Sequence, residues 1–92
     1  MAIVIKFKHS GFSAARYNEV IKKLQAAGLG NPKGRIYHVS YGDSNEVDIF
    51  DVWESMQDFD AFGKVLIPIL TSEGIELGKP DIQEIFGVIK GS

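Results

Sequence analysis

Alternating apolar and polar side chains mark the first segment of the chain. Within residues 2–9, Ile3, Ile5 and Phe7 share one side, and the lysines at positions 6 and 8 share the other. A period of two residues is typical of a strand with one buried face. The pattern therefore predicts a first strand over residues 2–9.

A helical period follows the first strand. Ser13 is a suitable N-cap, and the glycines at positions 28 and 30, followed by Pro32, are suitable terminators. Between these signals, apolar side chains recur at the i, i+3, i+4 and i+7 positions of one buried stripe. They are Tyr17, Val20, Ile21 and Leu24.

A second helix is expected to begin after Ser55. Ser55 can cap it, and Asp58 is well placed near the positive end of the helix dipole. Pro68 cannot donate a backbone hydrogen bond, so we expect the helix to kink or split there. Its buried side is marked by Phe59, Phe62, Leu66 and Leu70.

Three further strands complete the pattern. Residues 35–41 and 46–53 flank the turn residues 42–45 and predict a β-hairpin, and residues 82–90 predict the last strand. The order is strand, helix, strand, strand, helix, strand within a single domain, residues 1–92. The predicted fold class is α+β, a ferredoxin-like βαββαβ domain. It has a four-stranded antiparallel sheet with both helices on one face.

The loop of the hairpin decides which side chains share a face of the sheet. If Tyr41 opposes Glu46, or if the loop has two residues, the same set lies beneath the helices. An odd-numbered loop or a bulge would break the assignment. The set comprises Ile36, His38, Ser40, Val47, Ile49, Asp51 and Trp53. The orientation of the last strand stays open, because both of its sides are apolar.

The opposite face of the sheet has no helix to cover it. It carries more apolar surface than a soluble monomer normally exposes, and positions 65–70 of the second helix are apolar nearly all round. Both features predict a homodimer that forms through the open sheet face. The open-face side chains are Tyr37, Val39, Tyr41, Phe50 and Val52.

His38 and Asp51 are the sharpest chemical feature of the chain. They are expected to be diagonal neighbours beneath the helices, where a carboxylate needs a hydrogen-bond partner. A histidine beside a carboxylate can act as a general acid or base, so both are candidate catalytic residues. In the alternative interpretation, Asp51 binds Arg35 or backbone and His38 is a satisfied core residue.

Other side chains are candidates for binding a substrate. Tyr17 lies on the buried stripe, where its hydroxyl needs a partner, and His9 ends the first strand beside a glycine-containing loop. Trp53 could stack on a planar ligand, and Ile49 and Phe59 are expected to line a pocket. The alternative for Tyr17 and Trp53 is core packing, and His9 could simply be solvated.

Composition excludes several classes of function. Ten basic and twelve acidic side chains give a net charge of −2, which argues against a nucleic-acid partner or an anionic membrane. The absence of cysteine excludes disulfides and thiolate metal sites, and no metal-spaced set of ligands occurs. The apolar run at residues 65–70 is too short to span a bilayer, and nothing resembles a signal peptide. We expect a soluble, cytoplasmic protein.

Two segments carry a resemblance to a known superfamily. The chain resembles the dimeric α/β-barrel superfamily through its strand order and Asp51-Val52-Trp53-Glu54-Ser55. It looks most like small members related to antibiotic biosynthesis monooxygenases. The opening Ile3-Val4-Ile5-Lys6-Phe7-Lys8 is also similar to polyketide cyclases of this fold. The resemblance implies two sheets that pair face to face, and a small-molecule pocket between each sheet and its helices.

The sequence departs from two functional subgroups of that superfamily. Haem-degrading relatives use an axial histidine on the second helix, and cyclase-type members use a histidine near it. The second helix has no histidine here. Haem is therefore disfavoured, no cofactor is expected, and any catalysis must use His38, Asp51, Tyr17 or His9.

Three functions remain open at this point. The first is a cofactor-free monooxygenase, cyclase or isomerase that acts on a small apolar or aromatic metabolite held between sheet and helices. The second is a non-catalytic module that binds such a metabolite. The third is a purely structural dimer. Fold analogy alone does not decide between them.

Overall fold

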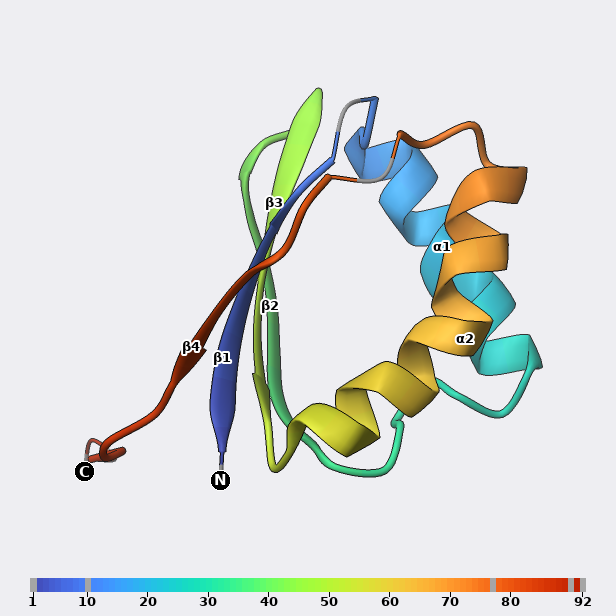
Figure 1. Cartoon of the computed structure of the whole chain (residues 1–92). Helices are drawn as coiled ribbons and strands as arrows, with labels where there is room; N and C mark the ends of the chain where they lie inside the picture. The colour runs from blue at the N-terminus through green and yellow to red at the C-terminus, as the bar shows by residue number, and fades with distance from the viewer. Residues whose placement is uncertain (1, 10, 77, 90, 92) are drawn as a thin grey trace.

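A four-stranded antiparallel sheet forms one layer of the molecule, and two helices form the other (Figure 1). The computed structural model describes residues 2–9, 11–76, 78–89 and 91. The sheet order is β2-β3-β1-β4, so the ferredoxin-like prediction is confirmed. The elements are β1 (Ile3–Lys8), α1 (Ala14–Ala26), β2 (Arg35–Asp43), β3 (Glu46–Trp53), α2 (Met56–Ser72) and β4 (Asp81–Glu84).

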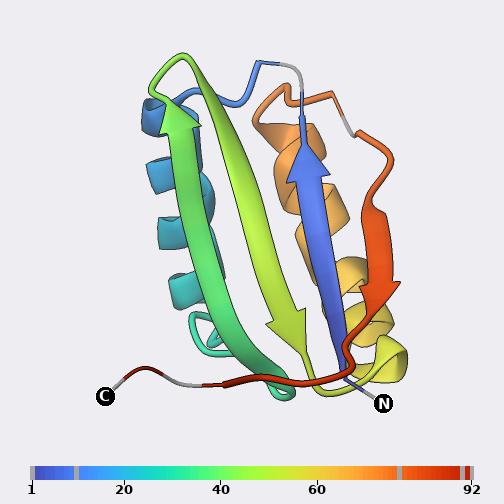
Figure 2. The ribbon, with the colours of Figure 1, turned by 90° about the vertical axis from the view of Figure 1, so that its left-hand side faces the viewer.

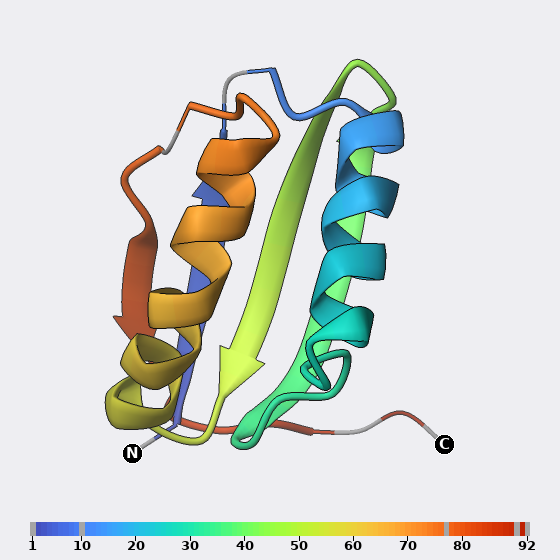
Figure 3. The same ribbon diagram turned by 90° about the vertical axis from the view of Figure 1, so that its right-hand side faces the viewer.

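Both helices lie on one face of the sheet and leave the other face open, as Figures 2 and 3 show from opposite sides. Each begins at the predicted serine. Ser13 Oγ accepts a hydrogen bond from the Arg16 amide at 3.2 Å, and Ser55 Oγ accepts one from the Asp58 amide at the same distance. The capping side chains replace bonds that the first helical turn cannot make.

The second helix is not split at Pro68. It runs without a break from Met56 to Ser72, and its ribbon bends part-way along (Figure 1). Pro68 lies on the exposed side of α2 and removes only the backbone bond to position 64. The rest of the helix therefore continues past it.

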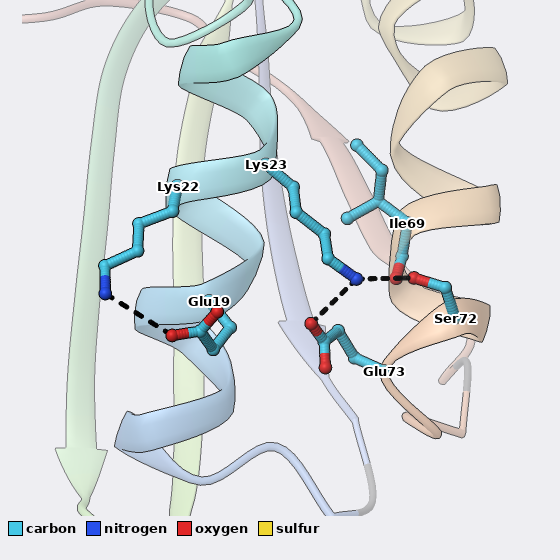
Figure 4. A network of polar contacts seen from close by, with 6 residues as sticks. All are labelled: Glu19, Lys22, Lys23, Ile69, Ser72 and Glu73. Carbon is cyan, nitrogen blue, oxygen red and sulfur yellow. Dashed lines mark hydrogen bonds and ion pairs between the residues drawn. The ribbon is translucent and has the colours of Figure 1, made fainter.

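A polar network links the C-terminal halves of the two helices at the surface (Figure 4). Lys23 Nζ lies 2.9 Å from Glu73 Oε1 and 3.1 Å from Ser72 Oγ. The Ser72 hydroxyl donates in turn to the Ile69 carbonyl at 2.7 Å. The Lys23 side chain is 44% exposed, so solvent screens the ion pair and its contribution to the free energy of folding is small.

The hairpin turns in two residues, with Asp43 opposite Glu46. Tyr41 consequently pairs with Asp48, two positions from the first alternative considered, and the predicted faces are preserved. His38 lies directly opposite Asp51. The expectation that these two are diagonal neighbours was wrong, because the shorter turn shifts the pairing by two residues along β3.

A bulge at the start of β2 changes the face of one predicted residue. The register shifts between Arg35 and Tyr37, and Arg35 pairs with Trp53. Ile36 is 46% exposed and does not lie beneath the helices as expected. Arg35 turns inward instead, with its guanidinium 5.9 Å from the centre of the Phe62 ring. An extra residue in a strand re-aims the side chains beside it.

The last strand is shorter than the prediction of 82–90. β4 ends at Glu84, which pairs with Ile3 at the beginning of β1, and one more bond joins the Ile85 amide to the Ala2 carbonyl. Residues 85–89 of the predicted strand do not belong to β4, and position 90 lies outside the described residues. Phe86 and Ile89 are 97% and 99% exposed.

The core lies between the sheet and the helices. Ile82 pairs with the fully buried Ile5 and packs against the core, which settles the orientation of β4. On the open face, Tyr37, Val39 and Tyr41 are exposed as expected, whereas Val52 is already buried within the chain. The buried apolar residues are Ile3, Ile5, Phe12, Val20, Leu24, Val47, Ile49, Val52, Trp53, Phe62, Leu70 and Ile75.

Candidate functional site

Two neighbouring strands place a histidine and a carboxylate together beneath the helices. His38 on β2 and Asp51 on β3 are direct cross-strand partners, and Nδ1 of His38 lies 2.6 Å from Oδ1 of Asp51. Asp51 is only 3% exposed. A buried carboxylate is strongly favoured to bind a hydrogen-bond donor, so in the neutral form of the ring the proton of His38 is on Nδ1 toward Asp51.

Tyr17 extends this pair from the first helix. Its hydroxyl lies 2.7 Å from Nε2 of His38, and the two rings are nearly parallel, with 7° between their planes. With the proton of His38 on Nδ1, Nε2 is an acceptor and the Tyr17 hydroxyl donates to it. Tyr17, His38 and Asp51 therefore form a continuous hydrogen-bonded relay across α1, β2 and β3, called the relay below.

The far end of the relay is held by Trp53. Its Nε1–H donates to Oδ2 of Asp51 at 3.3 Å, so each carboxylate oxygen has a side-chain donor. Arg35, the alternative partner considered for Asp51, instead donates to the Gly30 carbonyl at 3.0 Å. Trp53 itself is completely buried, packs against the rings of Phe59 and Phe62 on α2, and does not line the cavities described below.

The relay forms part of the wall of a small apolar cavity of about 40 Å³. Tyr17, His38 and Asp51 line it together with Ile49. Its polar side also includes Arg35, which the bulge of β2 turns inward. The other lining residues are Phe7, His9, Phe12, Val20, Ile21, Leu24, Phe62, Leu66 and Leu70.

A larger cavity of about 290 Å³ adjoins the first one. Four residues line both cavities: Phe7, His9, Leu66 and Leu70. The predicted pocket residue Phe59 lies on the larger cavity, as do Gly78 and Pro80. The candidate site is thus a small chamber at the relay with a wider chamber beside it, between α2 and the segment at 78–80.

His9 lies between the two chambers and is not solvated. It is 5% exposed, and its Nδ1 accepts a hydrogen bond from the Gly78 amide at 2.9 Å. Burial lowers the pKa of His9 below the usual value of a histidine, so the ring is neutral at pH 7. Contact with Gly78, 69 positions away, could not be read from local sequence.

Metal ligation is not supported by the arrangement of side chains. Within residues 2–9, 11–76, 78–89 and 91, no three His, Cys, Asp or Glu side chains gather closely enough to hold a metal ion. Across the same described ranges, none of the helices is long and apolar enough to cross a membrane.

Comparison with known proteins identifies the fold. No protein-family model matches the chain, and no curated protein matches it in sequence. Solved structures do match over nearly the whole length. SnoaB, a cofactor-independent oxygenase from Streptomyces nogalater, has a TM-score of 0.63 at 16% identity, covering 98% of this chain and 96% of SnoaB.

The fold is that of the antibiotic biosynthesis monooxygenase-like proteins. A proposed antibiotic biosynthesis monooxygenase from Deinococcus radiodurans matches with a TM-score of 0.66 at 15% identity, covering 100% of this chain and 99% of that one. A second one, from Caulobacter crescentus CB15, has a TM-score of 0.57 at 18% identity and coverages of 96% and 89%. The resemblance in fold noted from the sequence is confirmed.

Proposed function

We propose that the protein is a cofactor-free enzyme that removes a proton from a small, largely apolar substrate with a phenolic or enolisable group. The observation that carries the proposal is the relay of Tyr17, His38 and Asp51 in the wall of an apolar cavity. Converging polar groups in an otherwise apolar pocket are the usual architecture of a small-molecule site. The likeness in fold to a cofactor-independent oxygenase supports the same class of chemistry.

Each residue of the relay has a distinct role in this mechanism. The Tyr17 oxygen takes the substrate proton as its own proton passes to Nε2 of His38. Asp51 stabilises the imidazolium that results, and Trp53 holds Asp51 in place. General acid–base catalysis of this kind contributes about 10²–10⁴ in rate. The deprotonated substrate can then react with dioxygen, cyclise or isomerise.

Cavity size indicates how a substrate is held. A space of about 40 Å³ accommodates little more than a water molecule, whereas 290 Å³ is close to the lower range of ligand pockets. We therefore place the apolar body of the substrate in the larger chamber, against Phe59. Its reacting group would extend past Phe7 and His9, which line both chambers, to reach the relay.

A screen of phenols and enolisable aromatic ketones tests this function. Dioxygen uptake and mass spectrometry of the products distinguish an oxygenase from an isomerase or cyclase. His38→Ala is expected to lower turnover by about 10²-fold or more while the near-UV circular dichroism stays native. Lys22→Ala, on the exposed surface of α1, is the matched control and should leave turnover unchanged.

Two results of the same screen would overturn the enzymatic proposal. Saturable binding without turnover would indicate the non-catalytic binding module. Neither binding nor turnover would indicate the purely structural dimer. Equal turnover in the wild type and His38→Ala would leave an enzyme but remove the relay from its mechanism.

We also propose that the protein is a homodimer formed through the open sheet face, in the cytoplasm. Tyr37, Val39 and Tyr41 form an exposed apolar row on β2, which is an edge strand. Beyond Ile85, residues 86–89 leave the sheet on the open side, away from the helices (Figures 1 and 2), with Phe86 and Ile89 exposed. A second copy would cover both features. No nucleic acid or membrane partner is proposed, given the net charge of −2.

A further inference from the structure

The His9 ring is clamped in one orientation. Its centre is 5.4 Å from that of Phe7, in a stacked arrangement, and 5.6 Å from that of Phe12, which meets it edge to face. The Gly78 amide fixes the ring rotation through Nδ1. Gly78 is required at this close approach, because a side chain there would collide with the Lys8 carbonyl oxygen.

The same contacts determine which ring nitrogen carries the proton. Nδ1 accepts the Gly78 N–H, so it has no hydrogen of its own. In the described part of the chain no carboxylate forms an ion pair with His9, and burial lowers its pKa, so the ring is neutral. The single proton of the neutral imidazole is therefore on Nε2.

The Nε2–H group of His9 has no assigned acceptor in the described part of the protein. Over the described ranges, no hydrogen bond from Nε2 to another protein group is formed. It is also not sealed in the core, since Asp48 Oδ1 is the one described side-chain atom that is both buried and without a partner. His9 lines both chambers, so its ring borders the space assigned to the substrate.

We propose that Nε2–H of His9 donates a hydrogen bond to the substrate oxygen on which negative charge develops. The inference rests on the proposed function. The relay takes the substrate proton, and the electron pair of the broken bond is delocalised onto a phenolic or carbonyl oxygen. His9 keeps its proton throughout, and no oxidant is needed for this step. This donor fits the proposed substrate class, whose deprotonation yields a phenolate or an enolate.

A fixed, neutral donor suits this task for a physical reason. A group oriented before the reaction stabilises developing charge without reorganising, and its effect is large in an apolar site. A charged histidine would lose the bond to Gly78, because its Nδ1 would become a donor facing another donor. The contact with Gly78 therefore selects the neutral form and the Nε2–H tautomer together.

The tautomer can be tested on the unaltered protein. Long-range ¹H–¹⁵N correlation spectra at pH 7 should show His9 as the neutral Nε2–H form. Addition of 4-nitrophenol, whose phenolate absorbs in the visible range, should shift the Nε2 resonance. An Nδ1–H tautomer, an imidazolium, or an unmoved Nε2 resonance at high probe concentration would overturn the proposal.

Two substitutions test the donor itself. His9→Phe keeps an aromatic ring between Phe7 and Phe12 but has no N–H, whereas His9→Gln retains an amide donor. The wild type should lower the pKa of bound 4-nitrophenol, seen by visible titration, and His9→Phe should abolish that shift while His9→Gln restores part of it. On a substrate found in the screen, His9→Phe should lower kcat by about 10²–10³ with little change in KM.

The outcomes separate this inference from the proposed function. If His38→Ala abolishes turnover but His9→Phe leaves kcat and the probe pKa unchanged, the relay stands and the His9 proposal is wrong. If His38→Ala leaves turnover unchanged while the tautomer and probe shift are as expected, the oxyanion site stands and the relay is wrong. Equal probe spectra in the wild type and His9→Phe would contradict the inference in either case.

Discussion

Asp51 determines the chemistry of the site at the scale of single residues. Its carboxylate is buried and accepts from His38 on one oxygen and from Trp53 on the other. Burying a carboxylate without donors costs several kcal/mol, so these two bonds make the position tolerable. They also hold the imidazole in the orientation that lets Nε2 face Tyr17.

Asp51→Asn tests the carboxylate directly. The amide has nearly the same shape but cannot accept from both His38 and Trp53 through two oxygens. We expect turnover to fall by about 10²-fold or more and the free energy of unfolding to fall by about 1–3 kcal/mol, because a buried donor loses its partner. Kinetics and urea denaturation measure the two effects, and a variant with wild-type turnover would contradict the assigned role.

Trp53→Phe distinguishes a role of Trp53 in positioning Asp51 from a role in core packing alone. It removes the N–H donor to Asp51 and keeps an aromatic ring in the core. We expect a loss of stability of about 1–3 kcal/mol, since both the hydrogen bond and part of the buried ring are lost. The pH profile of kcat should also shift, which a loss of packing alone would not cause. An unchanged profile would show that Trp53 is only a core residue.

The lowered pKa of His9 predicts that the stability of the protein depends on pH. Burial lowers the pKa of folded His9 below 6.5, the value of an unperturbed histidine. As the pH falls toward and below 6.5, His9 binds a proton more readily in the unfolded chain than in the folded protein, so the free energy of unfolding decreases. Urea denaturation between pH 7.5 and 5.5 should therefore show a steeper loss in the wild type than in His9→Phe. Parallel curves would contradict a lowered pKa.

Part of the site was predictable at this scale and part was not. Strand parity places His38 and Asp51 on the same face whatever even loop joins their strands. The contact of Tyr17 with His38 depends on how α1 lies on the sheet, which a stripe of apolar residues does not specify. The hydrogen bond from Gly78 to His9 joins residues 69 positions apart, which only the complete fold brings together.

At the scale of elements, the departures from regular structure shape the site. The bulge at the start of β2 turns Arg35 toward the cavity and Ile36 outward, and the sequence carries no signal for the extra residue. β4 stops where β1 begins, so its length depends on its neighbour and not on its own apolar pattern. The helix caps at Ser13 and Ser55 were predictable, because capping depends on local contacts.

A pair of glycine substitutions tests the close approach of residue 78 to β1. Gly78→Ala would drive a methyl group into the Lys8 carbonyl and displace the amide from His9, so we expect a clear loss of stability and the loss of the Nε2–H tautomer. Gly63→Ala on α2 meets no atom within 4 Å and should be neutral or gain up to about 1 kcal/mol. Equal effects in the two variants, measured by thermal denaturation, would contradict the assigned role of Gly78.

At the scale of the whole molecule, one face of the sheet is not covered by helices. The helices protect the site side, whereas β2 presents an exposed apolar row and the segment after β4 extends past the sheet (Figure 2). An apolar open face could be predicted from composition. Hydrophobic residues make up 45% of the 92, and the face beneath the helices accounts for only part of them. Which residues of the open face are already covered within the chain, such as Val52, required the fold.

Sedimentation tests the proposed dimer. The wild type should sediment as a species of about twice 10.1 kDa at micromolar concentration. Val39→Lys places a charge in the centre of the exposed row and should yield a folded monomer, because an unpaired charge is costly in an apolar interface. Lys22→Ala serves again as the surface control. A wild-type monomer at that concentration would contradict the proposal.

The central claim is that Tyr17, His38 and Asp51 act as one unit, and a double-mutant cycle tests it most directly. Residues that act together show strongly non-additive losses. Comparison of kcat/KM for Tyr17→Phe, His38→Ala and the double variant, on a substrate found in the screen, should show the double variant no slower than His38→Ala alone. Losses that multiply, or a Tyr17→Phe variant with wild-type kcat/KM, would contradict the relay.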